Sequence, residues 1–178
     1  PPRLRRQRQM CIRDRVTSGM FLLAGAIILL INDGSALLTK FDINSLYGQL
    51  IFIAFGIKAA FPLLNGWLQD SYPEASEIGT VALSTFTTKL AIFCFAKCFA
   101  GTELLIVIGA IMTFYPIFFA VIENDLRRVL TYSLNNQLGF MIVAVGIGTE
   151  LAINGAVAHA FAHILYLSLI HISEPTRH

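Results

Sequence analysis

The sequence predicts an all-α membrane protein with about six transmembrane helices. Of its 178 residues, 56% are hydrophobic and 13% are charged, whereas a soluble domain has about 45–50% apolar and about 25% charged residues. Several stretches contain the roughly 20 mostly apolar residues that a helix needs to cross about 30 Å of hydrocarbon. A packed aqueous core cannot use so much apolar surface, but a bilayer can. The chain is therefore expected to be a multi-pass membrane protein.

Hydropathy and helix-breaking residues divide the chain into six apolar segments. These are residues 17–31, 45–68, 78–99, 103–122, 123–148 and 152–167, the last interrupted at about Leu167. No soluble domain, flexible linker or internal repeat is recognisable. Lys40 and Lys97 fall on one side of the membrane and Arg127 and Arg128 on the other. The positive-inside rule therefore does not fix the orientation.

The two ends of the chain differ from these segments. Residues 1–15 contain six arginines without apolar periodicity, and residues 168–178, SLIHISEPTRH, turn polar in the middle of an apolar helix. Both resemble translated sequencing adapter, so we expect them to be artefacts and residues 16–167 to be a partial transmembrane domain. The alternative for the first end is a basic arm that binds anionic lipid or nucleic acid. Without both ends the formal charge changes from +2 to −3, so the basic composition identifies no partner.

Two lysines lie in the middle of predicted transmembrane helices. Lys58 lies in LIFIAFGIKAAFPLL and Lys89 in VALSTFTTKLAIFCF. A lysine at a helix centre costs about 2.5–3.5 kcal/mol on insertion scales, and such residues usually face a bundle interior or a wet cavity. A structural ion pair between helices is the simpler explanation. Two lysines on neighbouring helices, with histidines on a third, favour a route for protons.

The helix that carries Lys58 is predicted to be discontinuous. Pro62 has no N–H and therefore cannot bond to the carbonyl of Lys58, four residues earlier. Gly56 adds conformational freedom. Broken backbone at membrane depth is tolerated where it is buried in protein or lines a cavity. The alternative is an ordinary proline kink, which is how we interpret Pro116.

A histidine pair lies on the last segment. His159 and His163, in NGAVAHAFAHILY, are four residues apart and so share one face of a helix. Histidine titrates near neutral pH and can relay protons. The pair is less suited to binding a metal, because no third ligand lies nearby in the sequence.

The fifth segment carries a polar stripe at helical spacing. It comprises Arg128, Tyr132, Asn135, Asn136 and Gly139. Amides and small residues often mediate contacts between membrane helices. That explanation is at least as good here as a polar path along Tyr132, Asn135 and Asn136.

Other chemistries leave no pattern in the sequence. We find no phosphate-binding glycine loop, iron–sulfur cysteine cluster, nucleophile elbow or paired intramembrane carboxylates. Cys94 and Cys98 lie one turn apart in an apolar segment and are more typical of small buried hydrophobes than of a redox pair. We therefore expect no cofactor, no metal, no catalytic residue and no nucleic-acid partner. Whether the chain forms part of an enzyme stays open.

Four phrases of the sequence resemble a known family. GIKAAFPLLNGWLQDSYPEA, TTK, ENDLRRVLTYSLNNQLGF and AHAFAHILY resemble the antiporter-like proton-channel subunits. These include the D-type subunits of Mrp-type Na⁺/H⁺ antiporters and the N, M and L subunits of NADH:quinone oxidoreductase. The resemblance covers roughly residues 17–167. It implies a fold of about fourteen helices built from two inverted repeats, each with one discontinuous helix, here near Lys58–Pro62.

The resemblance also implies roles for individual residues. Lys58 matches the family's lysine in the broken helix, and Lys89 matches the connecting lysine of the next helix. His159 and His163 match the histidines of a central water-lined axis. Relatives usually have a further lysine where this sequence has Leu167, and we attribute that difference to the adapter junction.

Three other departures from the family pattern are visible. The glutamate that partners the first lysine lies upstream of residue 16 in relatives and is absent here. Asn65 stands where relatives often have histidine, which leaves one protonation site in doubt. Gln69 stands where many have proline, outside the proton axis.

Three functions are compatible with these residues. The phrases WLQDSYPEA and FFAVIENDLRRVL resemble the antiporter branch. They favour a proton-translocating subunit of a multi-subunit monovalent cation/proton antiporter, with protons relayed by buried lysines and histidines. The second is a proton-pumping membrane subunit of NADH:quinone oxidoreductase (complex I), and the third is a non-transporting scaffold. The first two imply other subunits of the same complex, protons with Na⁺ as a further ion, and the bacterial inner (plasma) membrane.

Overall fold

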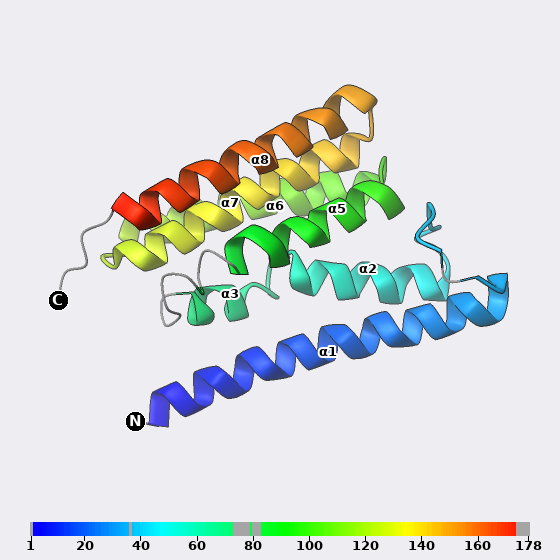
Figure 1. The fold of residues 1–178 in the computed structure, drawn as a ribbon, viewed down its shortest axis with the longest axis horizontal. Coiled ribbons are helices and arrows are strands. Elements are labelled where there is room, and N and C mark those ends of the chain that lie inside the picture. Colours follow the sequence, from blue (N-terminus) through cyan, green and yellow to red (C-terminus); the bar gives the residue numbers. More distant parts are fainter. Residues whose placement is uncertain (1, 36, 73–78, 80–82, 174–178) are drawn as a thin grey trace.

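The computed structural model describes residues 2–35, 37–72, 79 and 83–173, with side chains between residues 12 and 166 except residue 83. Its long helices run side by side (Figure 1), and no strand occurs in the described ranges. The helices are α1 (Pro2–Asp33), α2 (Leu46–Lys58), α3 (Gly66–Ser71), α5 (Thr88–Cys98), α6 (Glu103–Ile122), α7 (Leu126–Ile147) and α8 (Glu150–Ser173). One π-helical turn, η1 (Leu83–Thr87), precedes α5. The prediction of an all-α fold is confirmed.

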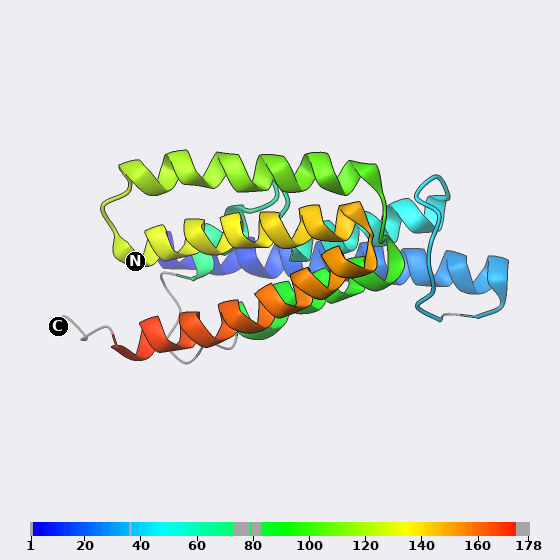
Figure 2. The same ribbon diagram turned by 90° about the horizontal axis from the view of Figure 1, so that it is seen from above.

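Helices α6 and α7 approach closely because glycines face each other. A Cβ on Gly139 would lie 2.6 Å from Oγ1 of Thr113 and 2.8 Å from the carbonyl oxygen of Gly109. A Cβ on Gly109 would lie 2.8 Å from the backbone nitrogen of Val143. Small residues of this kind let helix backbones pack without intervening side chains. Figure 2 shows α7 between α6 and α8. The glycine contact therefore holds α7, the middle helix of the three, against α6.

The core between α2 and α5 consists of phenylalanines. The ring of Phe95 on α5 stacks on that of Phe61 with centroids 5.3 Å apart, and meets the ring of Phe52 edge to face at 5.3 Å. Phe99 also meets Phe52 edge to face. Such pairs stabilise by about 0.5–1.5 kcal/mol beyond their area burial. They hold α2 against the helix that carries Lys89.

The turns at one end of the bundle touch. Gly101, after α5, and Gly148, after α7, both have left-handed backbones, with φ of 81° and 71°. A Cβ on Gly148 would collide with the Cα of Gly101. The N–H of Gly101 donates a hydrogen bond of 3.1 Å to the carbonyl of Val145. Gly148 combines a left-handed backbone with a close approach that leaves no room for a Cβ, whereas at Gly101 the left-handed backbone alone favours glycine.

The predicted segments and the helices agree in part. Within the described ranges, residues Ile12–Asp33 and Glu103–Ile122 are long and apolar enough to cross a membrane, and Leu46–Lys58 is apolar but shorter. The count of six transmembrane helices therefore stays a prediction. The expected interruption at Leu167 was wrong, since α8 continues to Ser173. Residues 168–173 contain no glycine or proline, and the first strong helix breaker is Pro175.

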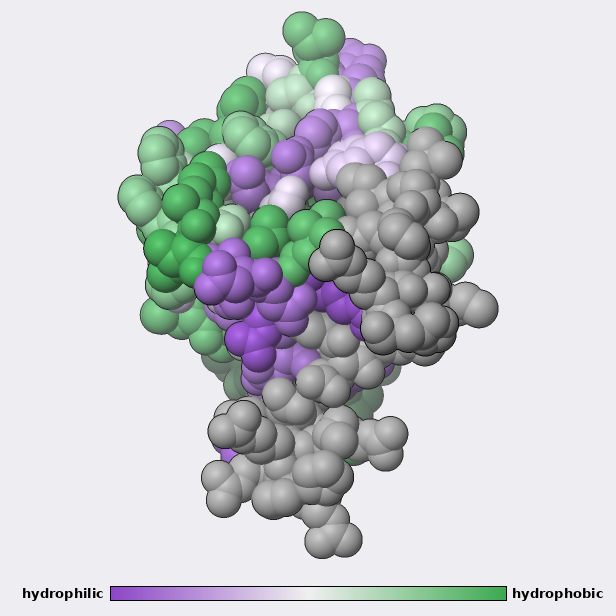
Figure 3. All heavy atoms as spheres, turned by 90° about the vertical axis from the view of Figure 1, so that its left-hand side faces the viewer, coloured by the Kyte–Doolittle hydropathy of each residue, from purple (hydrophilic) through white to green (hydrophobic). Residues whose placement is uncertain are grey.

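The surface separates an apolar side from a polar end. Helix α6 exposes many large apolar side chains, among them Phe114, Phe118 and Val121. Hydrophilic residues gather at the end of the molecule seen in Figure 3, where the α6–α7 turn carries an ion pair of 3.8 Å between Arg128 and Glu123. This separation suits an apolar slab bordered by water.

Candidate functional site

The segment after Lys58 leaves the helix abruptly. Helix α2 ends at Lys58, Ala60 has a φ of 59°, and α3 begins only at Gly66. Between them, the N–H of Leu64 bonds to the carbonyl of Phe61 at 2.9 Å, with Leu63 at a φ of 70°. This is the pattern of a type II turn with proline in its second position. A break thus follows Lys58 at the place where the sequence predicted one.

The two residues predicted to cause the break act differently from our expectation. Ala60 turns left-handed two residues before Pro62, so Pro62 lies in a turn that has already left the helix. Gly56 lies inside α2, and a Cβ there would lie 2.6 Å from the ring of Phe61. The N–H of Phe61 bonds to the carbonyl of Gly56 at 3.0 Å. Gly56 therefore supplies space for the returning chain.

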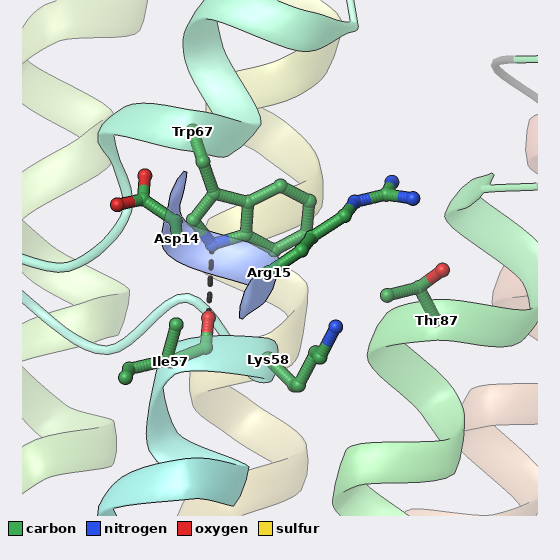
Figure 4. Close-up of a pocket in the computed structure, with 6 residues that line it drawn as sticks. All are labelled: Asp14, Arg15, Ile57, Lys58, Trp67 and Thr87. Atoms are coloured by element: carbon green, nitrogen blue, oxygen red, sulfur yellow. Dashed lines mark hydrogen bonds between the residues drawn. The ribbon is translucent and has the colours of Figure 1, made fainter. Parts of the chain in front are cut away.

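Lys58 lies at a small pocket between α1, α2, α3 and η1. The pocket is also lined by Asp14, Arg15, Ile57, Trp67 and Thr87 (Figure 4). Lys58 is half-buried, and its amine points to the same side of the pocket as Thr87. Within the described ranges, no carboxylate forms an ion pair with Lys58. Asp14 and Arg15 belong to the end that the sequence led us to exclude.

Lys89 lies on α5, directly after the π-turn. It is 9% exposed, and its Nζ has no hydrogen-bond partner among the described residues. The hydroxyl of Thr88 donates to the carbonyl of Ser84 at 3.2 Å within the same turn. π-turns inside α-helices are frequent at functional sites. The sequence predicted a regular helix here and gave no signal for this turn.

The histidine pair forms a stack along α8. The rings of His159 and His163 have centroids 6.2 Å apart and planes inclined by 21°. His163 is 1% exposed, and within the part of the chain that the structure describes neither of its ring nitrogens has a hydrogen-bond partner; nor does Nε2 of His159. Lys89 acts electrostatically on His163, as does His159. The fold thus places His163 of α8 within electrostatic range of Lys89 of α5.

Two residues near His163 were not predicted from the sequence. The ring of Tyr166 meets that of His163 edge to face, with centroids 4.9 Å apart. Ser133 of α7 lies close enough to Tyr166 to interact with its side chain. A tyrosine three residues after a histidine on a helix lies on the same side, and this spacing in HILY was the available signal.

The polar stripe of α7 is divided between two neighbours. The ring of Tyr132 stacks on that of Phe119 of α6 at 5.9 Å, and Gly139 packs on α6 as well. Asn135 is 1% exposed, and the Oδ1 atoms of Asn135 and Asn136 have no hydrogen-bond partner. Tyr132 and Gly139 therefore contribute to the helix contact, while both amides keep unused acceptors.

Among the described residues, three helices carry most of the buried polar atoms without a hydrogen-bond partner, and Asn65, just before α3, carries another. They include Lys89 on α5, Asn135 and Asn136 on α7, and His159 and His163 on α8. Buried polar groups are normally hydrogen-bonded to protein or water, so each exception needs an explanation. Lys58 is linked to this set through Thr87, which lines its pocket and lies two residues before Lys89. No described group of three His, Cys, Asp or Glu side chains could hold a metal ion.

A helical bundle with an apolar exterior and buried lysine and histidine side chains defines a class of membrane protein in which ionisable groups lie between helices. The particular family follows from comparison with known sequences. The sequence model of the family described as "NADH:quinone oxidoreductase/Mrp antiporter, TM" matches residues 10–173. The chain belongs to this family of transmembrane proteins, and the predicted resemblance is confirmed.

Individual relatives show a similarity of about one residue in three. NADH-quinone oxidoreductase subunit M of Escherichia coli K12 is 31% identical over 121 residues, which are 63% of this chain and 24% of the relative. Subunit L of Neisseria meningitidis serogroup A is 32% identical over 132 residues, 70% of this chain and 19% of the relative. The chain thus spans a quarter or less of these curated relatives.

A solved structure has the same fold. A chain in the structure of the Mrp complex from Dietzia sp. DQ12-45-1b matches 93% of this chain with a TM-score of 0.83 and 20% sequence identity. The match covers 34% of that chain. At this identity the likeness shows the fold alone.

Proposed function

We propose that the chain is part of a proton-translocating membrane subunit in which Lys58, Lys89, His159 and His163 relay protons. The observation that carries this proposal is that Lys89 lies close enough to His163 to act on it electrostatically. They come from different helices, both are buried, and their nitrogens have no hydrogen-bond partner. A scaffold would gain nothing from such groups, since unpaired buried polar atoms cost free energy. A relay needs them, because protons move through groups that can exchange partners with water.

The proposed relay begins at the break after Lys58. Whether an amine inside a membrane holds its proton depends on the water and the charges beside it. A helix end that opens onto a pocket gives Lys58 a place to exchange a proton. Lys89 would pass the proton on from the far side of η1, and the stacked histidines would carry it along α8. Asn135 and Asn136, with unused acceptors, are suited to holding water beside this route.

We further propose membership of a multi-subunit monovalent cation/proton antiporter, as a D-type subunit in a bacterial inner membrane. Support comes from the phrases WLQDSYPEA and FFAVIENDLRRVL and from the fold shared with a chain of an Mrp complex. A second candidate is a proton-pumping subunit of NADH:quinone oxidoreductase, which the similarity to subunits M and L favours. Neighbouring genes in the source contig separate the two: small antiporter subunits or quinone-reductase subunits.

Proton flux tests the relay. The complete gene product, in its complex, should dissipate a pH gradient across inverted vesicles, and Lys58→Ala should abolish this while leaving expression and assembly intact. Lys97→Ala is the matched control, because Lys97 is an exposed lysine on α5. Proteoliposomes of residues 16–167 alone should show no flux above empty controls. Normal flux in Lys58→Ala, or robust flux from the segment, would contradict the proposal.

A further inference from the structure

The broken end of α2 leaves backbone carbonyls that need hydrogen-bond donors. The last four carbonyls of any helix lack partners within it. Here the carbonyl of Phe55 accepts from the N–H of Ala59 at 2.8 Å, and that of Gly56 accepts from the N–H of Phe61 at 3.0 Å. The carbonyl of Ile57 accepts a longer bond of 3.3 Å from the N–H of Ala60. Of these three carbonyls, that of Ile57 accepts the longest backbone bond, and Ile57 directly precedes Lys58.

A side chain from the next helix donates a further hydrogen bond to the carbonyl of Ile57. The indole Nε1 of Trp67, on α3, donates a buried hydrogen bond of 2.9 Å to the carbonyl oxygen of Ile57. Figure 4 shows the indole reaching from α3 down to the end of α2, with Lys58 beside the bonded carbonyl. Trp67 is 4% exposed, and its ring lines the same pocket as Lys58. In an apolar surrounding, a bond to a freed carbonyl is stronger than in water, because water does not compete for it.

The bond also links the two halves of the broken helix. Residues 59–65 contain two left-handed residues, Ala60 and Leu63, so the segment does not hold itself in one conformation by helical bonds. The Trp67 bond spans this segment and ties the first turn of α3 to the last turn of α2. A change in this bond alters the direction in which the last residue of α2 points.

We infer that Trp67 is a positioning residue for Lys58: its indole N–H closes the broken end of α2 and thereby fixes the Lys58 amine in the pocket shared with Thr87. The consequence for proton transfer rests on the proposed function, but the geometric claim does not. In this scheme Trp67 does not transfer protons itself. It acts by positioning Lys58.

The chain contains a single tryptophan, which makes a one-atom test feasible. Growth of a tryptophan auxotroph on 3-benzothienylalanine replaces the N–H of Trp67 by sulfur and keeps the shape of the ring. Growth on 5-fluorotryptophan keeps the N–H and is the matched control. The full 178-residue chain is reconstituted in nanodiscs, and its lysines are dimethylated with ¹³C, so that Lys58 and the exposed Lys97 report separately by NMR. Trp67→Phe is a second variant without the donor.

Loss of the N–H should move the Lys58 signal by more than its linewidth and leave the Lys97 signal in place. Backbone amides of Ala59 and Ala60 should exchange about two- to tenfold faster, the factor expected for one lost hydrogen bond. Trp67→Phe should give the same displacement, and 5-fluorotryptophan should give none. An unmoved Lys58 signal in the sulfur analogue would overturn the inference, as would an equal displacement by the fluorinated ring. Neither readout requires transport. The inference about Trp67 can therefore fail while the proposed relay holds, and the relay can fail while the inference holds.

Discussion

His163 lies edge to face with Tyr166, their ring centroids 4.9 Å apart, and both of its ring nitrogens stay unbonded. Ser133 on α7 lies close to the side chain of Tyr166. The ring of His163 is therefore held by packing, and both nitrogens are buried with no hydrogen bond to the described residues. A histidine that only stabilises a core would use at least one nitrogen in a hydrogen bond.

Replacement of this histidine should separate stability from transport. In His163→Leu, no hydrogen bond seen in the structure is lost and the volume is nearly kept, so the free energy of unfolding should change by less than about 1.5 kcal/mol. Proton flux by the complete gene product should fall at least tenfold (about 1.4 kcal/mol). SDS titration followed by circular dichroism and vesicle flux measure the two quantities. Unchanged flux would make His163 a packing residue.

Replacement of Lys89 should also affect proton flux and stability differently, and more strongly than replacement of His163. Its Nζ is buried without a partner, so Lys89→Met replaces a costly polar group by an apolar side chain of similar length. We expect the free energy of unfolding to rise by about 1–3 kcal/mol and proton flux to disappear. Lys97→Met, an exposed position on the same helix, should change neither. A less stable Lys89→Met protein would indicate a structural partner for the amine.

The contact between α6 and α7 should tolerate no additional methyl group at its centre. Gly139→Ala places a Cβ 2.6 Å from Thr113 Oγ1 and 2.8 Å from a backbone carbonyl, so it should destabilise by about 1–3 kcal/mol. Gly155→Ala, on α8, meets no atom within 4 Å and should be neutral or stabilising by up to about 1 kcal/mol. SDS unfolding of the two variants compares them. Equal stability would mean that the helices separate more easily than their packing indicates.

The ends of the chain are open to a direct test. We predict that long-read sequencing of the source locus replaces residues 1–15 and 168–178 by native sequence, with a glutamate upstream and a lysine at position 167. The reason is the abrupt change from apolar to adapter-like sequence at both junctions. A native gene that encodes PPRLRRQRQ at this place would show that the exclusion was wrong.

Several features followed from the sequence alone because they depend on local chemistry. Composition required a membrane, and the apolar run between Thr102 and Glu123 fixed α6 to the residue. The four-residue spacing of His159 and His163 fixed their common face, since the helical period does so wherever the helix packs. Proline and glycine near Lys58 indicated a break, although not how it is built.

The tertiary structure decided what depends on neighbours distant in sequence. Tyr132 packs on Phe119 and Trp67 reaches Ile57, and both are contacts between different helices. Lys89 of α5 lies within electrostatic range of His163 of α8. Hydrophobic periodicity shows which face of a helix is buried but not which helix covers it. The π-turn before Lys89 had no signal either, because a shift of one residue in backbone bonding is set by the packing around the helix. The sequence thus showed which ionisable residues lie within apolar helices, and helix packing determined which of them lie near one another.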